Sequence, residues 1–337
     1  MKQRLVIKPC YCDRIAKAID AYIRKADNDL SKQLGKEGYA KPKKTLQDAQ
    51  DIEDDVADIL TEETDYFVRE AKASGSLEDF QKKLPAVTAA TPATAKLSKA
   101  FAARLSKFLP EYAAYYLKQT DKNLKLDRVS KRTTAWIESW SDELADLMRT
   151  TSKDQLEAML KKEINNGGNI SQFCVDLIGS GMEKEGKGEY WTSHYRARRV
   201  AVTEILGAHS VAQQEAFMQS PAVEGKSWRH TGDYRNEPRQ NHIDMDGQVV
   251  PKDKPFELTG ADGIVYYPMY PRDVILPAGE RINCHCIQQP VVSEDILGLP
   301  LEERQKLQQQ AIDEMDDDWE AELDAQNKAK AGIEDET

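Results

Sequence analysis

Hydrophobic residues recur every three or four positions through most of the first 220 residues, with charged residues between them. That spacing places apolar side chains on one face of a helix. The capping box of Ser152 and Gln155 predicts a new helix start, and Asn166-Gly167-Gly168 predicts a stop. We therefore expect helices over residues 15–34, 48–72, 132–148, 152–164, 171–178 and 191–218.

Two neighbouring stretches allow different interpretations. Residues 85–94 are rich in Ala, Thr and Pro, which is typical of a mobile connection. Residues 91–132 then carry ten bases and three acids together with several aromatic residues. Such a segment fits either a nucleic-acid contact or an amphipathic helix that buries its aromatic side chains, and helical spacing favours the helix. It could pair with the stretch 45–80, which has twelve acids and two bases.

The helical period disappears after Pro221. Short strands are expected at residues 226–230, 248–250 and 264–267, separated by Asp-Gly turns. The sequence thus predicts an α+β protein with a mostly helical N-terminal body and a small, loop-rich α+β C-terminal module. We place the helical region at 1–168, the module at 169–292, and an acidic tail, helical or disordered, at 293–337.

Composition and charge narrow the class of protein. The 337 residues are 40% hydrophobic and 31% charged, and no apolar run approaches the ~20 residues of a membrane span. We expect no signal peptide and no membrane contact. The net charge of −11 lies in the tail, because residues 294–337 hold fifteen acids and four bases. The five cysteines do not suggest a disulfide framework, so a reducing cytoplasm fits.

Thiol and imidazole groups gather in the C-terminal module. His242, Cys284 and Cys286 offer three of the four ligands that a structural Zn²⁺ requires. The fourth is open, and Asp233, Asp244 and His230 are the candidates. The alternative is that both cysteines fill the core while His242 binds a backbone carbonyl.

Charged residues near these ligands have candidate structural roles. Arg235 and Arg239 could contact DNA or a partner, but loop arginines more often bind acids such as Asp233, Asp246 or Asp253. In the last long helix, a buried Glu204 requires an arginine, and the cluster that includes Arg199 offers one. Trp228 is expected in the core.

The same residues could also form a catalytic site. Cys284, His242 and Asn283 could form a nucleophile set, and His242 with Asp244 a nuclease-like pair. Asn283 is adjacent to Cys284 in the chain, however, and cannot easily orient a distant imidazole. The sequence also lacks a second carboxylate cluster for Mg²⁺. We therefore expect no enzymatic activity.

Residues 169–292 together resemble the phage Mu F-like head morphogenesis (minor capsid protein) family. The resemblance is carried by the helix 199–204, by Trp228, Asp233, Arg235, Arg239 and His242, by the turn Asp246-Gly247-Gln248, by Phe256, and by 282–286. The sequence departs from the family pattern at His285, where Arg is more usual. Other members have a second cysteine pair where this chain has Arg239 and His242.

The resemblance implies a component of the phage head. It implies a minor capsid protein, present in multiple copies at or near the portal vertex, that takes part in head assembly with portal and capsid proteins as partners. Such a protein is assembled in the host cytoplasm and resides in the virion. The alternative is a virion-carried protein delivered with the DNA, which binds nucleic acid or acts enzymatically on the host.

Overall fold

A computed structural model describes residues 29–179, 193–231 and 239–331. The chain forms two compact units, residues 1–47 and 48–337. In the first unit, residues 29–37 are helical, and the rest of the helix expected at 15–34 lies outside the described residues. The Thr45 hydroxyl donates to the Ala40 carbonyl (2.8 Å) beside the start of α2.

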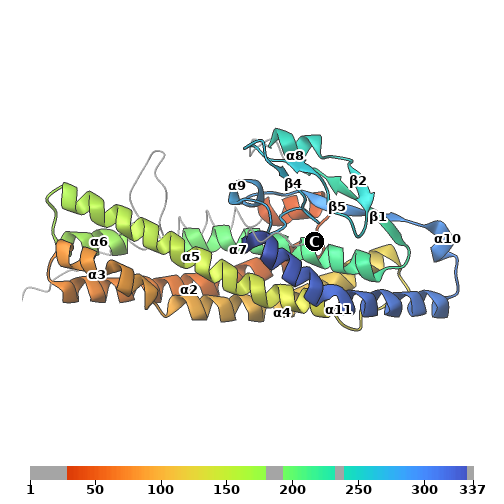
Figure 1. Ribbon diagram of the computed structural model, residues 1–337, viewed down its shortest axis with the longest axis horizontal. Helices are drawn as coiled ribbons and strands as arrows, with labels where there is room; N and C mark the ends of the chain where they lie inside the picture. Colours follow the sequence, from red (N-terminus) through yellow and green to blue (C-terminus); the bar gives the residue numbers. More distant parts are fainter. Residues whose placement is uncertain (1–28, 180–192, 232–238, 332–337) are drawn as a thin grey trace, which may run out of the picture. The chain divides into compact units, whose positions relative to one another are not determined.

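Long helices build most of the second unit. They are α2 (Pro42–Ser74), α3 (Leu77–Ala89), α4 (Ala93–Thr120), α5 (Lys131–Asn165), α6 (Ile170–Gly179) and α7 (Ser193–Gln219). Helix α4 packs along both α5 and α7 (Figure 1). Its aromatic residues Phe101, Phe108, Tyr112 and Tyr116 are buried at helical spacing. The expectation that aromatic residues of the basic segment belong to a helical core is confirmed.

The acidic and basic helices pair by charge. Arg104 of α4 contacts Asp55 of α2 through Nε (2.6 Å) and Nη2 (3.0 Å) and Asp51 through Nη1 (2.8 Å). Lys96 also pairs with Glu62. A guanidinium is planar and donates several hydrogen bonds in fixed directions. The Arg104 contact therefore fixes the register of the two helices better than a lysine contact does.

Two boundaries expected from the sequence are wrong. Helix α3 includes Pro85, and only residues 90–92 separate it from α4, so the Ala/Thr/Pro stretch is mostly helical. The neighbours Leu84 and Val87 are buried, and their packing offsets the hydrogen bond that a proline removes. Helix α5 also runs through Ser152 without a break, because the Ser152 hydroxyl donates to Glu63 (2.8 Å) instead of capping a new helix.

The C-terminal part carries a small antiparallel sheet against α7. Strand β1 (Val223–Arg229) lies between β2 (Val249–Pro251) and β5 (Ile287–Val292), and β3 (Leu258–Thr259) pairs with β4 (Val265–Tyr266). Strands β1, β2 and β4 confirm the three expected from sequence; β3 and β5 were not expected. The short helices α8 (Gln240–Asp244) and α9 (Ala278–Arg281) lie between strands, and α10 (Glu294–Leu297) follows β5. A helical body with a small α+β region confirms the predicted fold class.

The acidic C-terminal stretch forms a helix, α11 (Leu301–Ala331), that packs on α5 and α7. Arg304 at its start pairs with the buried Asp121. Further along, Asp316 accepts from the Lys131 amide (2.6 Å) and pairs with Arg128 (2.6 Å). Within the described residues, no helix combines the length and apolar character needed to cross a membrane.

Candidate metal centre

The three predicted ligands meet in space. His242 lies on α8, and Cys284 and Cys286 lie between α9 and the start of β5. Their ligand atoms all lie within 4.8 Å of one another, and all three side chains are buried. A loop-rich module thus brings together residues that are about forty positions apart in the chain.

The spacing of these atoms fits a tetrahedral zinc site. The His242 Nδ1 atom lies 3.5 Å from Cys284 Sγ and 3.6 Å from Cys286 Sγ. Zn–S bonds of about 2.3 Å and Zn–N bonds of about 2.0 Å at tetrahedral angles place sulfur and nitrogen about 3.5 Å apart. Thiolate and imidazole are also the ligand types that zinc prefers. The residues present therefore fit zinc in type and in separation.

A carboxylate orients the histidine from behind. The His242 Nε2 atom lies 2.8 Å from Glu280 Oε2, on the ring edge opposite the sulfur atoms. Burial raises the pKa of Glu280, but hydrogen bonds from the Ala261 amide, Asn241 and His242 outweigh it and lower the pKa overall. A charged Glu280 accepts a hydrogen bond from the Nε2–H group, which leaves the Nδ1 lone pair facing the thiols. This arrangement of carboxylate and histidine is usual behind metal ligands.

Among the three candidates for a fourth ligand, His230 is placed best, although its ring nitrogen lies outside the group of ligand atoms within 4.8 Å that His242, Cys284 and Cys286 form. Its Nδ1 lies 3.5 Å from Cys286 Sγ, at the end of β1. Burial lowers the pKa of His230, which favours the neutral ring that binds metals. Asp244 instead accepts from Gln240 (2.8 Å) and is exposed. Asp233 lies outside the described residues.

Arg272 holds the cysteine segment. Its Nη1 donates to the carbonyls of Cys284 (2.9 Å) and Cys286 (2.7 Å), and its Nη2 donates to Ser210 of α7 (2.6 Å). A hydrogen bond from Cys286 lowers the pKa of the Cys284 thiol, with help from His242 and Arg272. The same bond raises the pKa of Cys286. The pocket is thus prepared for a thiolate, the form that binds zinc.

The predicted turn packs under the ligands. Trp228 is fully buried, and its ring meets those of His242 and Phe256 edge-on. The Gly247 amide donates to the Trp228 carbonyl (2.9 Å), and Gly247 has a φ of +84°, which glycine adopts without strain. Asp246 accepts from the His230 amide (2.8 Å) and so fixes the backbone of the fourth candidate ligand.

The remaining predicted site residues lie elsewhere or outside the described chain. Arg239 donates to the Ile282 carbonyl (2.6 Å) and lies 3.9 Å from Glu280, an acid that was not among those expected. Glu204 is buried, but Arg281 of α9 contacts it (3.6 Å) in place of the nearby arginine cluster. Arg199 lies on the exposed face of α7. Asp233 and Arg235 are outside the described residues.

Sequence reasoning missed three side chains of this region: Glu280, Arg272 and Arg281. A weak signal existed for Glu280, because an acid four residues before Cys284 sits on the short turn that leads into the cysteines. Arg272 and Arg281 act across long stretches of chain, through a bond to Ser210 and a contact with Glu204. Spacing along the sequence carries no information about such partners.

Comparison with known proteins agrees with this architecture. Residues 154–289, which include the end of α5, helices α6 and α7, most of the sheet and the His–Cys centre, match the family described as phage Mu protein F like protein. The chain belongs to this family of phage head morphogenesis proteins. It is also 32% identical over 316 residues to "Uncharacterized protein YqbB" of Bacillus subtilis (strain 168), which covers 90% of this chain and 99% of that relative. No solved structure matches.

Proposed function

We propose that this protein is a structural and interaction component of the phage head that acts at or near the portal vertex during head assembly. Membership of the phage Mu F-like family supports a role among head proteins. The portal and capsid proteins are the proposed partners, the host cytoplasm is the site of assembly, and the virion is the final location. In this proposal the protein has no enzymatic activity.

The single observation that carries the proposal is the closed character of the His–Cys centre. Cys284 and His242 are only 3% and 2% exposed, and Glu280 behind them is 3% exposed. A catalytic zinc keeps an open position for water or substrate, and a nucleophilic cysteine needs access. A centre whose three gathered ligands are buried in this way stabilises a module, and a stable module suits a binding role.

We further propose that the centre holds one structural Zn²⁺. His242, Cys284, Cys286 and His230 are the proposed ligands. The ion would join the end of β1, helix α8 and the cysteine segment before β5, three segments with little regular structure between them. Metal binding would then contribute directly to the stability of the folded module.

The metal is tested by native mass spectrometry of the whole chain. One zinc per chain is expected, and Cys284→Ser should lose it. Cys174→Ser is the matched control, because Cys174 is also buried but lies on α6. A mass equal to that of the bare chain, with no change in melting temperature on adding a chelator, would contradict the zinc proposal.

The partner is tested by co-sedimentation with purified portal protein at ~0.15 M salt, with duplex DNA in a parallel sample. Binding to portal without binding to DNA is the expected result. If the chain ignores the portal protein but binds DNA with a strong salt dependence, the portal proposal is wrong and delivery with the DNA becomes the better interpretation.

A further inference from the structure

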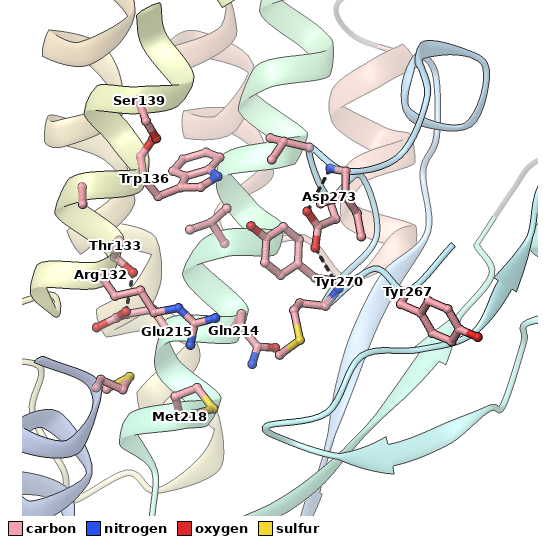
Figure 2. Close-up of a pocket in the computed structure, with 16 residues that line it drawn as sticks. Arg132, Thr133, Trp136, Ser139, Gln214, Glu215, Met218, Tyr267, Tyr270 and Asp273 are labelled. Carbon is pink, nitrogen blue, oxygen red and sulfur yellow. Dashed lines mark hydrogen bonds between the residues drawn. The ribbon is translucent and has the colours of Figure 1, made fainter. Parts of the chain in front are cut away.

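A pocket lies between the helical body and the module, away from the His–Cys centre. It has a volume of ≈ 290 Å³ and is lined by α5, α7, the loop 267–275 after β4, and Met315 of α11. Figure 2 shows these side chains converging from the helices and from the loop. This volume is near the lower end for ligand pockets and suits one bulky side chain.

The lining is mainly apolar and adaptable. Trp136, Tyr270 and the methionines Met218, Met269 and Met315 contribute to it. Methionine side chains adjust to different shapes and are common on surfaces that bind proteins. Burial raises the pKa of Tyr270 well above its usual range, consistent with a weakly polar interior.

Apolar surface continues outside the pocket. Tyr267 and Ile275 line the pocket and are 56% and 43% exposed. Ile264 (56%) and Val265 (42%), shortly before Tyr267 in the chain, are exposed as well. A small molecule in the pocket would leave these side chains in water, whereas an extended protein segment would cover them. The shape of the apolar surface therefore favours a protein partner.

Both acids of the pocket already have internal donors. Glu215 accepts from the Ser130 amide and hydroxyl and from Thr133, and Gln219 adds a further bond. Asp273 accepts from the amides of Met269 (2.8 Å) and Ile275 (3.2 Å). Their oxygen atoms serve the fold and are poorly placed to bind a donor on a partner.

Donor groups face the pocket instead. The Trp136 Nε1 atom is buried and has no hydrogen-bond partner among the described residues. In Figure 2 it points across the pocket toward the loop of Tyr270 and Asp273. The Arg132 guanidinium also lines the pocket. A buried N–H without a partner costs free energy, which a ligand with an acceptor oxygen recovers.

We infer that this pocket docks a segment of another head protein that inserts a bulky apolar side chain and presents a carboxylate next to it. The carboxylate accepts from Trp136 and faces Arg132, while the flanking chain covers Tyr267 and Ile275. This inference rests on the proposed function, because it takes the partner to be a head protein.

The chemistry of the pocket is tested with a small probe. The full chain is titrated with 4-phenylbutyrate and with its neutral amide, 4-phenylbutyramide, and binding is followed by saturation-transfer NMR. The acid should bind about tenfold more tightly than the amide, since a hydrogen bond to a charged group contributes more than a neutral one. Arg132→Gln should remove this preference. Equal binding of the two probes would overturn the inference that the docked segment presents a carboxylate.

A blocking variant tests the site itself. Ser139 lines the pocket from the exposed face of α5, so Ser139→Trp fills the entrance with little effect on the core. It should abolish binding of 4-phenylbutyrate, whereas Ser139→Ala, the matched control, should bind normally. Circular dichroism of both variants reports whether the fold is kept. Unchanged probe binding by a folded Ser139→Trp protein would contradict this location.

The same variants separate this inference from the proposed function. If wild-type chain and Ser139→Ala bind portal protein and Ser139→Trp does not, both proposals are supported. If all three bind portal equally, the pocket proposal fails and the portal proposal stands. If wild-type chain does not bind portal at all, the portal proposal fails, and the probe titration still decides whether the pocket takes an apolar carboxylate.

Discussion

The Trp140 indole nitrogen donates to the carboxylate of Glu204 across 2.7 Å, and both side chains are buried. Arg281 completes a triangle, because its guanidinium lies 3.6 Å from Glu204 and its Cζ lies 4.3 Å from the centre of the Trp140 ring. The three residues belong to α5, α7 and α9. One buried carboxylate thus connects the helical body to the C-terminal module.

Replacing Glu204 by Ala should destabilise the protein by about 3 kcal/mol, because it leaves the buried Trp140 indole N–H without its acceptor and the half-buried Arg281 guanidinium without its carboxylate. Glu204→Gln keeps one oxygen for Trp140 and should cost less. Urea unfolding measures both values. Glu138→Ala, an exposed position on α5, is the control and should change stability by no more than about 0.5 kcal/mol. Equal stability of Glu204→Ala and wild type would show that the triangle contributes nothing.

Glu280 should tune the metal affinity without binding the metal. Glu280→Gln removes the charge behind His242, and the zinc affinity should fall by about 10- to 100-fold. Competition with a chromophoric chelator measures the affinity. Glu257→Gln is the control, since Glu257 lies in the same module and is exposed. An unchanged affinity in Glu280→Gln would mean that the carboxylate does not orient His242.

Arg272 combines a special backbone conformation with a structural side chain. Its φ is +68°, and its guanidinium holds the carbonyls of Cys284 and Cys286. Both Arg272→Ala and Arg272→Gly should lose these bonds, but the backbone strain of a Cβ at positive φ, already present in wild type, remains in Arg272→Ala and is relieved in Arg272→Gly. Thermal unfolding should therefore rank wild type above Arg272→Gly and Arg272→Gly above Arg272→Ala, the last step by about 1 kcal/mol. The reverse order of the two variants would exclude backbone strain as a factor.

Lys226 predicts a particular dependence of stability on pH. It is fully buried on β1, donates to Gln214 (3.1 Å) and to the Met269 carbonyl (2.7 Å), and lies over the Phe256 ring. Burial lowers its pKa to about 7; Arg132 lowers it too, while Asp273 and Asp253 raise it. The unfolded chain therefore binds one proton more than the folded chain between about pH 7 and pH 10.

The contribution of Lys226 to the free energy of unfolding should rise with pH across that window, by at most about 1.4 kcal/mol per pH unit. Below about pH 7 this contribution should be constant. Lys226→Met should remove this slope. The measurement is urea unfolding at pH 7 and pH 9 for wild type and variant. Lys254→Met, at an exposed lysine of the same module, should keep the wild-type slope. The prediction fails if the difference between wild type and Lys226→Met is the same at both pH values.

The sequence predicts this fold where the information is local. Periodic apolar residues define α2, α4 and α7, and the Asp-Gly turns separate the strands. The prediction fails where a residue far away in the sequence determines the local structure. Ser152 has the sequence of a helix cap, yet Glu63, 89 positions away, takes its hydroxyl and the helix continues. Pro85 is typical of a break, yet the buried residues beside it keep the chain helical.

The candidate metal centre shows the same division. The sequence alone identifies His242, Cys284 and Cys286 as three candidate ligands, and His230 as one of three candidates for the fourth. The choice of His230 over Asp244 depends on the end of β1 lying beside β5, a pairing that joins Arg229 to Ile287. Strand β5 itself contains Pro290 and two glutamines and lacks a clear alternating pattern, so that pairing could not be predicted.

The position of β5 has a consequence for synthesis on the ribosome. Central strand β1 is made early in the module, but one of its two partners, β5, ends only at Val292, just after both cysteines. Helices α2 to α5 can pack as they emerge, whereas the sheet and its ligand set remain incomplete until Val292 has left the exit tunnel. A nascent chain stopped before residue 287 therefore presents an open edge of β1, and the sheet forms only after helices α2 to α7 have been made.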